Sequence, residues 1–129
     1  MNTKTKLSGH RCLVTGAAGF IGSTLVSKLI DKESVVKGLD NMNKYYDPIL
    51  KERRKNNLIE KARAKKEESF SFEQIDLRDN ESIFEVVKRF KPDTICHLGA
   101  QAGVRYSLEN PHSYIDNNVT STINLLEAS

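Results

Sequence analysis

The sequence predicts an α/β fold in which a doubly wound parallel sheet, partial and with strand order 3-2-1-4, is covered by helices on both faces. Three observations predict it. Short apolar runs alternate with helical patterns, a glycine-rich loop follows the first apolar run, and an aspartate ends the second. Apolar strands between helices are typical of parallel sheets that are buried on both faces, and right-handed crossovers then give that strand order.

The first half of the chain contains two of the expected strands. Residues 11–16 (RCLVTG) form an apolar run that is typical of a buried strand, residues 20–30 carry apolar side chains at helical spacing, and residues 34–40 (SVVKGLD) form the second strand. Residues 41–69 follow as a charged, largely helical insertion. A basic nucleic-acid patch is conceivable there, but no aromatic residues beyond Tyr45 and Tyr46 are interleaved with the charges, which favours a solvated helix.

The second half continues the alternation. Residues 71–77 (SFEQIDL) form the expected third strand, and residues 79–90 form a helix with Asp79 as its N-cap. The fourth strand covers residues 93–100.

A last helix is expected to begin at Pro111, with Asn110 as its cap, and to run through the sequence NLLEA. Its apolar stripe, which we expect to face the core, consists of Ile115, Val119, Thr122, Ile123 and Leu126.

Size and composition restrict the possible functions. The 129 residues suffice for one domain, and a net charge of +3 is too small to imply a nucleic-acid partner. No apolar run has the length of a membrane span, and the polar N-terminus lacks the apolar core of a signal peptide, so we expect a cytoplasmic protein without a membrane partner. Cys12 and Cys96 lie in strand-like runs, where we expect buried, reduced thiols, and they have no metal-ligand spacing.

The glycine-rich loop VTGAAGFIG, residues 14–22, has the spacing and the context of a phosphate-binding turn, because it follows a strand and opens a helix. Gly16 permits the tight turn, Gly19 lets the backbone approach a pyrophosphate, and Gly22 lets the helix pack against the strand. The free N–H groups at the helix N-terminus then face the phosphates. A glycine turn without a ligand is the alternative.

Asp40 ends the second strand, where a carboxylate accepts both ribose hydroxyls of an adenosine and repels a 2′-phosphate. It therefore favours NAD over NADP, although the nearby cation of Lys44 could soften that preference. Asn41 and Asn43 could add hydrogen bonds to the same sugar. The alternative is an aspartate that only caps a turn.

Further candidates lie at the ends of the third and fourth strands. Asp76 could accept from the adenine amine while Leu77 packs on the ring, and the alternative is a turn that caps the next helix. Small residues after the fourth strand, within residues 98–101, leave room for the second ribose, and the alternative is an ordinary turn with a Gly-Ala pair. Asn118 needs a hydrogen-bond partner, which that loop or the cofactor could supply, and the alternative is a structural amide that bonds to backbone. His97 is expected to be structural.

The motifs VTGAAGFIG, GLDNMNKYYDPILKERR, DLRD and HLGAQAGVRYSLENPHSYIDNNVTSTINLLE together resemble the extended short-chain dehydrogenase/reductase family of NAD-dependent epimerases and dehydratases. Among its members, the chain is most similar to the UDP-glucuronate 4-epimerases. The resemblance covers the chain from residue 11 onward, and the motifs NMNKYYDPILK and QAGVRYSLENP are its most specific parts. It implies a Rossmann-type domain that binds NAD.

The resemblance also implies a mechanism. NAD takes a hydride from C4 of a UDP-sugar, the 4-keto sugar turns in the site, and the hydride returns to the other face, which inverts C4. Arg105 is suggested as a contact to the anionic groups of the substrate. The residues expected to contact NAD, from the loop, the strand ends and the resemblance together, are Gly16, Gly19, Phe20, Ile21, Gly22, Asp40, Asn41, Asn43, Asp76, Leu77, Leu98, Gly99, Ala100, Gln101 and Asn118.

The family's catalytic Tyr-x-x-x-Lys pair is missing, because no tyrosine of the chain is followed by a lysine four residues later. We therefore expect residues 1–129 to be the N-terminal part of an NAD-binding domain, inactive alone, with the catalytic part and the substrate domain beyond Ser129. We expect the isolated chain to self-associate and the full-length enzyme to be a homodimer. The alternatives are a nucleotide-sugar 4,6-dehydratase or decarboxylase, or a non-catalytic dinucleotide-binding module.

Overall fold

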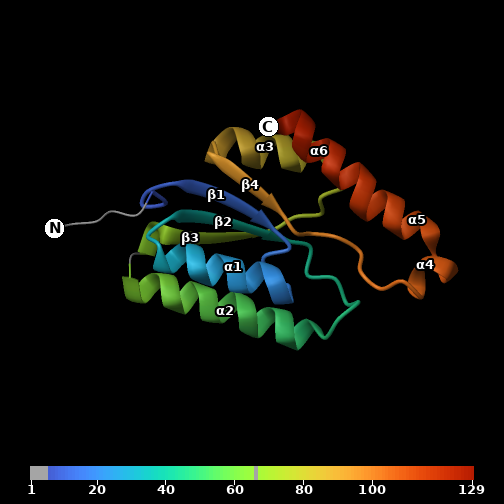
Figure 1. The fold of residues 1–129 in the computed structure, drawn as a ribbon, viewed down its shortest axis with the longest axis horizontal. Coiled ribbons are helices and arrows are strands. Elements are labelled where there is room, and N and C mark those ends of the chain that lie inside the picture. Colours follow the sequence, from blue (N-terminus) through green and yellow to red (C-terminus); the bar gives the residue numbers. More distant parts are fainter. Residues whose placement is uncertain (1–5, 66) are drawn as a thin grey trace.

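The computed structural model describes residues 6–65 and 67–129, and in it four parallel strands form one sheet in the order β3-β2-β1-β4 (Figure 1). The predicted fold class and strand order are therefore confirmed. The sheet contains β1 (Arg11–Thr15), β2 (Val35–Asp40), β3 (Phe70–Gln74) and β4 (Thr94–His97).

Helices cover both faces of the sheet. α1 (Phe20–Asp31) and α2 (Pro48–Lys65) lie on one face, and α3 (Asn80–Phe90) and α6 (Ser121–Ala128) lie on the other (Figure 1). Because successive side chains of a strand point to opposite faces, β1 contributes to two cores. Cys12 and Val14 pack with α1 and α2, whereas Leu13 packs with α3 and α6.

The predicted helix caps are confirmed. Asp79 accepts a hydrogen bond from the amide of Ser82 at the start of α3, at 3.3 Å. Asn110 accepts one from the amide of Ser113, at 3.2 Å, at the start of α5 (Pro111–Tyr114), with Pro111 in the first turn. Each cap satisfies a backbone donor that has no acceptor within its helix.

Two strands are shorter than the sequence predicts. β3 ends at Gln74, which pairs with Asp40 at the end of β2, and β4 ends at His97, which pairs with Thr15 at the end of β1. A strand stops where its partner stops, so the residues beyond lie in loops. Asp76 therefore follows β3 in a loop instead of closing the strand.

The last helix differs more strongly from the prediction. A short helix, α4 (Tyr106–Glu109), precedes it, and the π-helical turn η2 (Ile115–Thr120) separates α5 from α6. The predicted buried stripe is wrong: its apolar members Ile115, Val119, Ile123 and Leu126 are between 52% and 68% exposed. A π turn holds more residues than an α turn, so the residues that follow it face in a different direction. Ser121 and Leu125 are therefore buried in place of the predicted stripe.

α2 is more than a solvated charged helix. It buries Leu58 and Ala62 in the core that it shares with α1, and its Lys61 donates to the carbonyl of Ser27 at 3.0 Å. The 3₁₀ turn η1 (Glu67–Ser69) then leads into β3. Cys12 is buried as predicted, whereas Cys96 is only half-buried, because β4 is an edge strand of the described sheet.

Candidate cofactor-binding site

A small groove opens at the carboxyl ends of β1 and β4, where the order of the sheet reverses. Ligands of doubly wound proteins bind at this position. The groove has a volume of about 110 Å³, below the roughly 300–1,000 Å³ of enclosed ligand pockets, so an extended ligand would lie along it and remain partly outside. It is lined by Gly16, Gly19, Asp40, Asn41, Asn43, Asp76, Leu77, Leu98, Gly99, Ala100, Gln101, Asn117 and Ser121.

All of these residues except Asn117 and Ser121 are candidates that the sequence predicts. Five other candidates lie outside the lining of the groove: Phe20, Ile21, Gly22, Arg105 and Asn118.

The glycine loop has the geometry that the sequence predicts for two of its glycines. Gly16 has a φ of 68°, and a Cβ atom there would lie 2.8 Å from backbone atoms of Leu98 and Gly99. A Cβ atom at Gly22 would lie only 1.9 Å from the carbonyl oxygen of Gly16. The loop and the first turn of α1 therefore pack closely, and a side chain at Gly16 or Gly22 would prevent this packing.

The N-terminus of α1 is suited to an anion. Gly19 is the N-cap and provides no side-chain hydrogen bond, and the first turn contains no acidic residue. The amides of Phe20, Ile21 and Gly22 belong to this turn, where helix geometry provides no acceptor. The side chains of Phe20 and Ile21 are 77% and 67% exposed.

Asp40 is held in place at the end of β2. Its Oδ2 atom accepts from the amide of Ala18 at 3.1 Å, and its Oδ1 atom accepts from the amide of Met42 at 2.8 Å. The carboxylate thus connects the glycine loop to the loop after β2. The predicted proximity of Asp40 to the glycine turn is confirmed.

A residue that the sequence analysis missed completes this cluster. Lys51 of α2 is buried, and its Nζ atom lies 3.3 Å from Oδ1 of Asp40 and 3.2 Å from Oδ1 of Asn43. Helical spacing was a usable signal, because Lys51 lies seven and eleven residues before the buried Leu58 and Ala62, on one face of α2. The nearby Lys44, which the sequence analysis singled out, is exposed.

Asp76 and Leu77 both line the groove, as predicted, but Asp76 already has a partner. The guanidinium of Arg78 binds its carboxylate through Nε and Nη2, the latter at 2.6 Å. These hydrogen bonds lower the pKa of Asp76 below its usual value. Asp76 is therefore an ionised acceptor at the rim, and its suggested contact to adenine remains a prediction.

Asn118 acts on the groove through another residue. Its Oδ1 atom accepts from the amide of Gln101 at 2.7 Å, and its Nδ2 atom donates to the carbonyl of Gln101 at 3.3 Å. The partner that the sequence analysis expected from the loop after β4 is therefore present. Asn117 and Ser121, its neighbours on η2 and α6, line the groove instead.

Thr15 and His97 fix the start of that loop. Oγ1 of the buried Thr15 is 2.7 Å from Nδ1 of His97 and accepts from the amides of Leu98 and Gly99, both at 3.0 Å. Nε2 of His97 lies 3.2 Å from Oγ1 of Thr122. Burial lowers the pKa of His97, so the ring is neutral at pH 7 and has the structural role that was expected.

Arg105 is exposed and directly precedes α4, so its suggested substrate contact stays a prediction. The described residues contain no group of three or more His, Cys, Asp or Glu side chains that could hold a metal ion. Among the same residues, no helix has both the length and the apolar character needed to cross a membrane.

A parallel sheet with a glycine turn, an open helix N-terminus and an acid at the end of β2 defines a dinucleotide-binding domain of the Rossmann type. Within this class, the GDP-mannose 4,6 dehydratase family model matches residues 13–129, and the chain belongs to that family of epimerases and dehydratases. The resemblance stated from the sequence motifs is thereby confirmed.

Named relatives agree with this assignment. The UDP-glucuronate 4-epimerase of Thermodesulfobacterium geofontis is 44% identical over 115 residues, which are 89% of this chain and 34% of that protein. UDP-glucuronate 4-epimerase 4 of Arabidopsis thaliana is 43% identical over 120 residues, which are 93% of this chain and 26% of that protein. The chain thus spans about a third or less of the length of these relatives.

Solved structures show the same fold. The UDP-glucose 4-epimerase of Thermus thermophilus, solved in complex with NAD, is 34% identical with a TM-score of 0.71, over 92% of this chain and 33% of that one. The UDP-Glc/GlcNAc 4-epimerase of Campylobacter jejuni is 30% identical with a TM-score of 0.79, over 93% and 33% of the two chains.

Proposed function

We propose that the chain binds NAD as the cofactor-binding part of a nucleotide-sugar 4-epimerase. The observation that carries the proposal is the groove between β1 and β4, with the glycine turn on one side and Asp40 on another. The residues fit a dinucleotide. At Gly16 and Gly22, backbone atoms occupy the positions that Cβ atoms would need, which gives the tight glycine turn, and the first-turn amides of α1 lack helical acceptors.

Each group has a distinct role in this proposal. The first-turn amides of α1 bind the pyrophosphate, Asp40 accepts from the adenosine ribose, and Asp76 and Leu77 contact the adenine. Bound NAD supplies reversible hydride acceptance at C4 of the sugar, and the protein supplies position and electrostatics. The loop after β4, fixed by Thr15 and Asn118, borders the second ribose.

We propose UDP-glucuronate as the substrate of the whole protein, because the relatives of T. geofontis and A. thaliana bear that activity in their names. Arg105 is proposed to reach its anionic groups. We also propose that the 129-residue chain alone does not epimerise, since none of its four tyrosines has a lysine four residues later. The proposed cellular location is the cytoplasm, and the proposed assembly of the full-length enzyme is a homodimer.

A 4,6-dehydratase is the second candidate, because the matching family model is named for that reaction. Both enzymes take a hydride from C4, so their cofactor-binding parts share the same groove. The product of the full-length protein separates them: an epimerase returns a sugar of unchanged mass, and a dehydratase returns one that has lost water.

Titration of the chain with NAD⁺ by calorimetry tests the proposal, with Gly19→Ala as the variant. Gly19 has an extended backbone that alanine adopts, with φ −76° and ψ 173°, and it lines the groove. A methyl group beside the pyrophosphate is expected to weaken NAD⁺ binding at least about tenfold, which corresponds to roughly 1.4 kcal/mol.

Thr24→Ala, on the exposed side of α1, is the matched control and should bind NAD⁺ like the unsubstituted chain. If the chain is well folded and has no measurable affinity for NAD⁺, the proposed function is wrong. If Gly19→Ala binds NAD⁺ as tightly as the unsubstituted chain, the glycine loop is not part of the binding site.

A further inference from the structure

We propose that Lys51 sets the cofactor preference of this site: its ammonium group neutralises Asp40 and reduces the discrimination against a 2′-phosphate on the adenosine ribose. The inference rests on the proposed function, because it concerns the dinucleotide that the groove would bind. It adds a specificity residue from α2, a helix whose basic residues would otherwise be read as a solvated surface.

The first step is the burial of the pair. Lys51 is 7% exposed and Asp40 is 6% exposed, and their charged atoms are 3.3 Å apart. Buried ammonium groups need partners, and here the partners are the two residues expected at the ribose, Asp40 and Asn43. The cation therefore lies beside the residues expected at the adenosine sugar, whereas the other basic residues of α2 are half-buried or exposed.

The second step is the charge that a ribose would meet. An unpaired carboxylate after β2 repels a 2′-phosphate, which is the reason that such an acid favours NAD. At Asp40 the nearest cation cancels that charge at short range, in a site where little water screens it. The bonds to Asp40 and Asn43 use two of the three N–H groups of Lys51, and no described residue accepts from the third. In the proposal, a 2′-phosphate oxygen accepts from this third N–H group.

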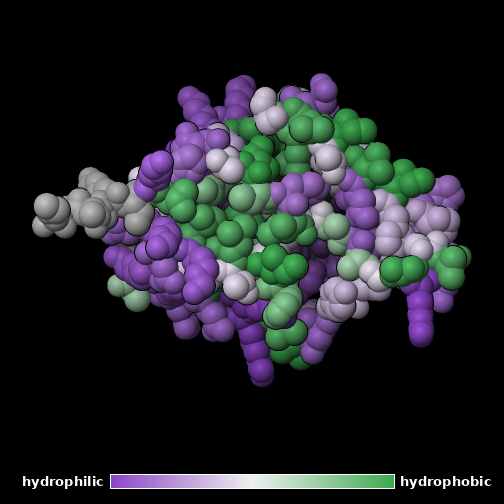
Figure 2. Space-filling model, viewed as in Figure 1, coloured by the Kyte–Doolittle hydropathy of each residue, from purple (hydrophilic) through white to green (hydrophobic). Residues whose placement is uncertain are grey.

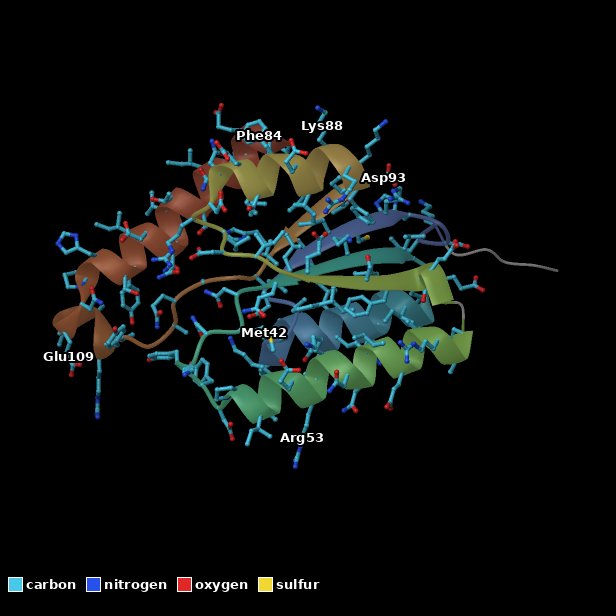
Figure 3. All side chains as sticks on the ribbon, turned by 180° about the vertical axis from the view of Figure 1, so that it is seen from behind. Met42, Arg53, Phe84, Lys88, Asp93 and Glu109 are labelled. Atoms are coloured by element: carbon cyan, nitrogen blue, oxygen red, sulfur yellow. The ribbon has the colours of Figure 1, made fainter. Side chains whose placement is uncertain are left out.

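The third step is the positioning of the cation by α2. Lys51 lies in the first turns of this helix, and Arg54, one turn later, donates to the carbonyl of Ala18 in the glycine loop at 3.4 Å. These two side chains hold the helix against the loop. Arg53 points away from the body of the protein (Figure 3) and is exposed. It carries the same charge on the same helix without facing the groove, which makes it a control.

The test is the ratio of the dissociation constants for NADP⁺ and NAD⁺, measured by calorimetry on the 129-residue chain. In Lys51→Met this ratio is expected to rise about tenfold, because the carboxylate keeps its ribose contacts and regains its repulsion of the phosphate. In Arg53→Met the ratio should stay at the value of the unsubstituted chain. A merely structural role of Lys51 would weaken both ligands alike, so an unchanged or lower ratio in Lys51→Met overturns the proposal.

Lys51→Met leaves a buried carboxylate without its cation, and this variant could fold poorly. The double variant Asp40→Asn/Lys51→Met avoids that problem, because it removes both charges. In Asp40→Asn the buried ammonium of Lys51 keeps Oδ1 of Asn43 as a hydrogen-bond acceptor. Asp40→Asn keeps the cation of Lys51, and the double variant does not. The ratio of the dissociation constants for NADP⁺ and NAD⁺ is therefore expected to be about tenfold lower in Asp40→Asn than in the double variant. Equal ratios in these two variants overturn the proposal.

The result also separates this inference from the proposed function. If the unsubstituted, folded chain binds neither nucleotide, both are wrong. If it binds NAD⁺ while the ratio is insensitive to Lys51, the proposed function holds and the role of Lys51 is refuted.

Discussion

Single residues determine whether the groove can form. Gly22 is the clearest case, since a Cβ atom at this position would lie 1.9 Å from the carbonyl oxygen of Gly16 and 2.7 Å from its carbonyl carbon. Both contacts are to backbone, which cannot rotate away as a side chain can. The glycine therefore fixes the distance between α1 and the turn that precedes it.

Gly22→Ala is expected to lower the free energy of unfolding by about 1 to 3 kcal/mol, as overpacking of a close contact does. Urea denaturation followed by circular dichroism measures this difference. Thr24→Ala, on the exposed side of the same helix, should lie within about 0.5 kcal/mol of the unsubstituted chain. An unfolding free energy of Gly22→Ala that matches that control would show that the loop relaxes at no cost.

The residues that could be predicted are those whose role depends on local sequence. The spacing of Gly16 and Gly22 dictates the turn, and the position of Asp40 follows from the end of a strand, so the turn and the position of the carboxylate could be predicted. Lys51 could not be singled out by composition, because its role depends on which face of α2 meets the sheet. Asn117 was missed because the π turn changes the direction of side chains along that helix.

At the scale of elements, charged pairs join α1 to α2. Asp31 at the end of α1 accepts from Lys61 and Lys65 of α2, at 2.9 and 3.0 Å. Hydrogen bonds from these two ammonium groups lower the pKa of Asp31 to about 2. The stabilisation that they give is therefore complete above the unfolded pKa, near 3.8, and is lost as the pH falls through about 2.

Asp31→Asn is expected to lower the urea midpoint at pH 6, and the difference from the unsubstituted chain should disappear near pH 2. Urea titrations at several pH values between 6 and 2 follow this convergence. Glu85→Gln, an exposed substitution on α3, should leave the midpoint at pH 6 unchanged. A difference between Asp31→Asn and the unsubstituted chain that persists undiminished at pH 2 would contradict the assigned pairing.

The existence of every strand and of the helices α1 and α3 followed from apolar patterning, but the ends of the strands did not. Ile75 and Leu77 continue the apolar pattern of β3, yet the strand stops at Gln74, because its partner β2 ends at Asp40. Strand length is thus a property of the pair and not of one segment. The short helix α4 was not predicted, since Tyr106–Glu109 lacks any periodic apolar signal.

At the scale of the whole molecule, one face is unusually apolar. Green apolar side chains gather over the centre of the view in Figure 2 and along the helix at its upper right. The exposed residues include Phe20 and Ile21 of α1, Leu98 after β4, and Ile123 and Leu126 of α6. A groove of about 520 Å³ runs between the edge strand β4 and α6. Exposed apolar faces beside an unpaired strand edge favour association.

The isolated chain is therefore expected to self-associate at high concentration, and Ile123→Lys/Leu126→Lys to remain monomeric under the same conditions. Size-exclusion chromatography with light scattering over a range of concentrations measures the mass. Ile49→Lys is the matched control, because Ile49 is an isoleucine of α2 with 63% exposure on the other side of the sheet. Monomers of the unsubstituted chain at every concentration would contradict the expectation.

The hydrogen bonds of Thr15 also determine where protons sit on His97. Oγ1 of Thr15 accepts two amides, which uses both of its lone pairs, so its own proton must go to Nδ1 of the ring. The imidazole therefore carries its hydrogen on Nε2, directed at Thr122, whose hydroxyl in turn donates to the carbonyl of Asn118. An imidazolium would reverse the first of these bonds and force Thr15 to release an amide. Acidification would thus break a hydrogen bond between Thr15 and the backbone of Leu98 or Gly99, two residues that line the groove.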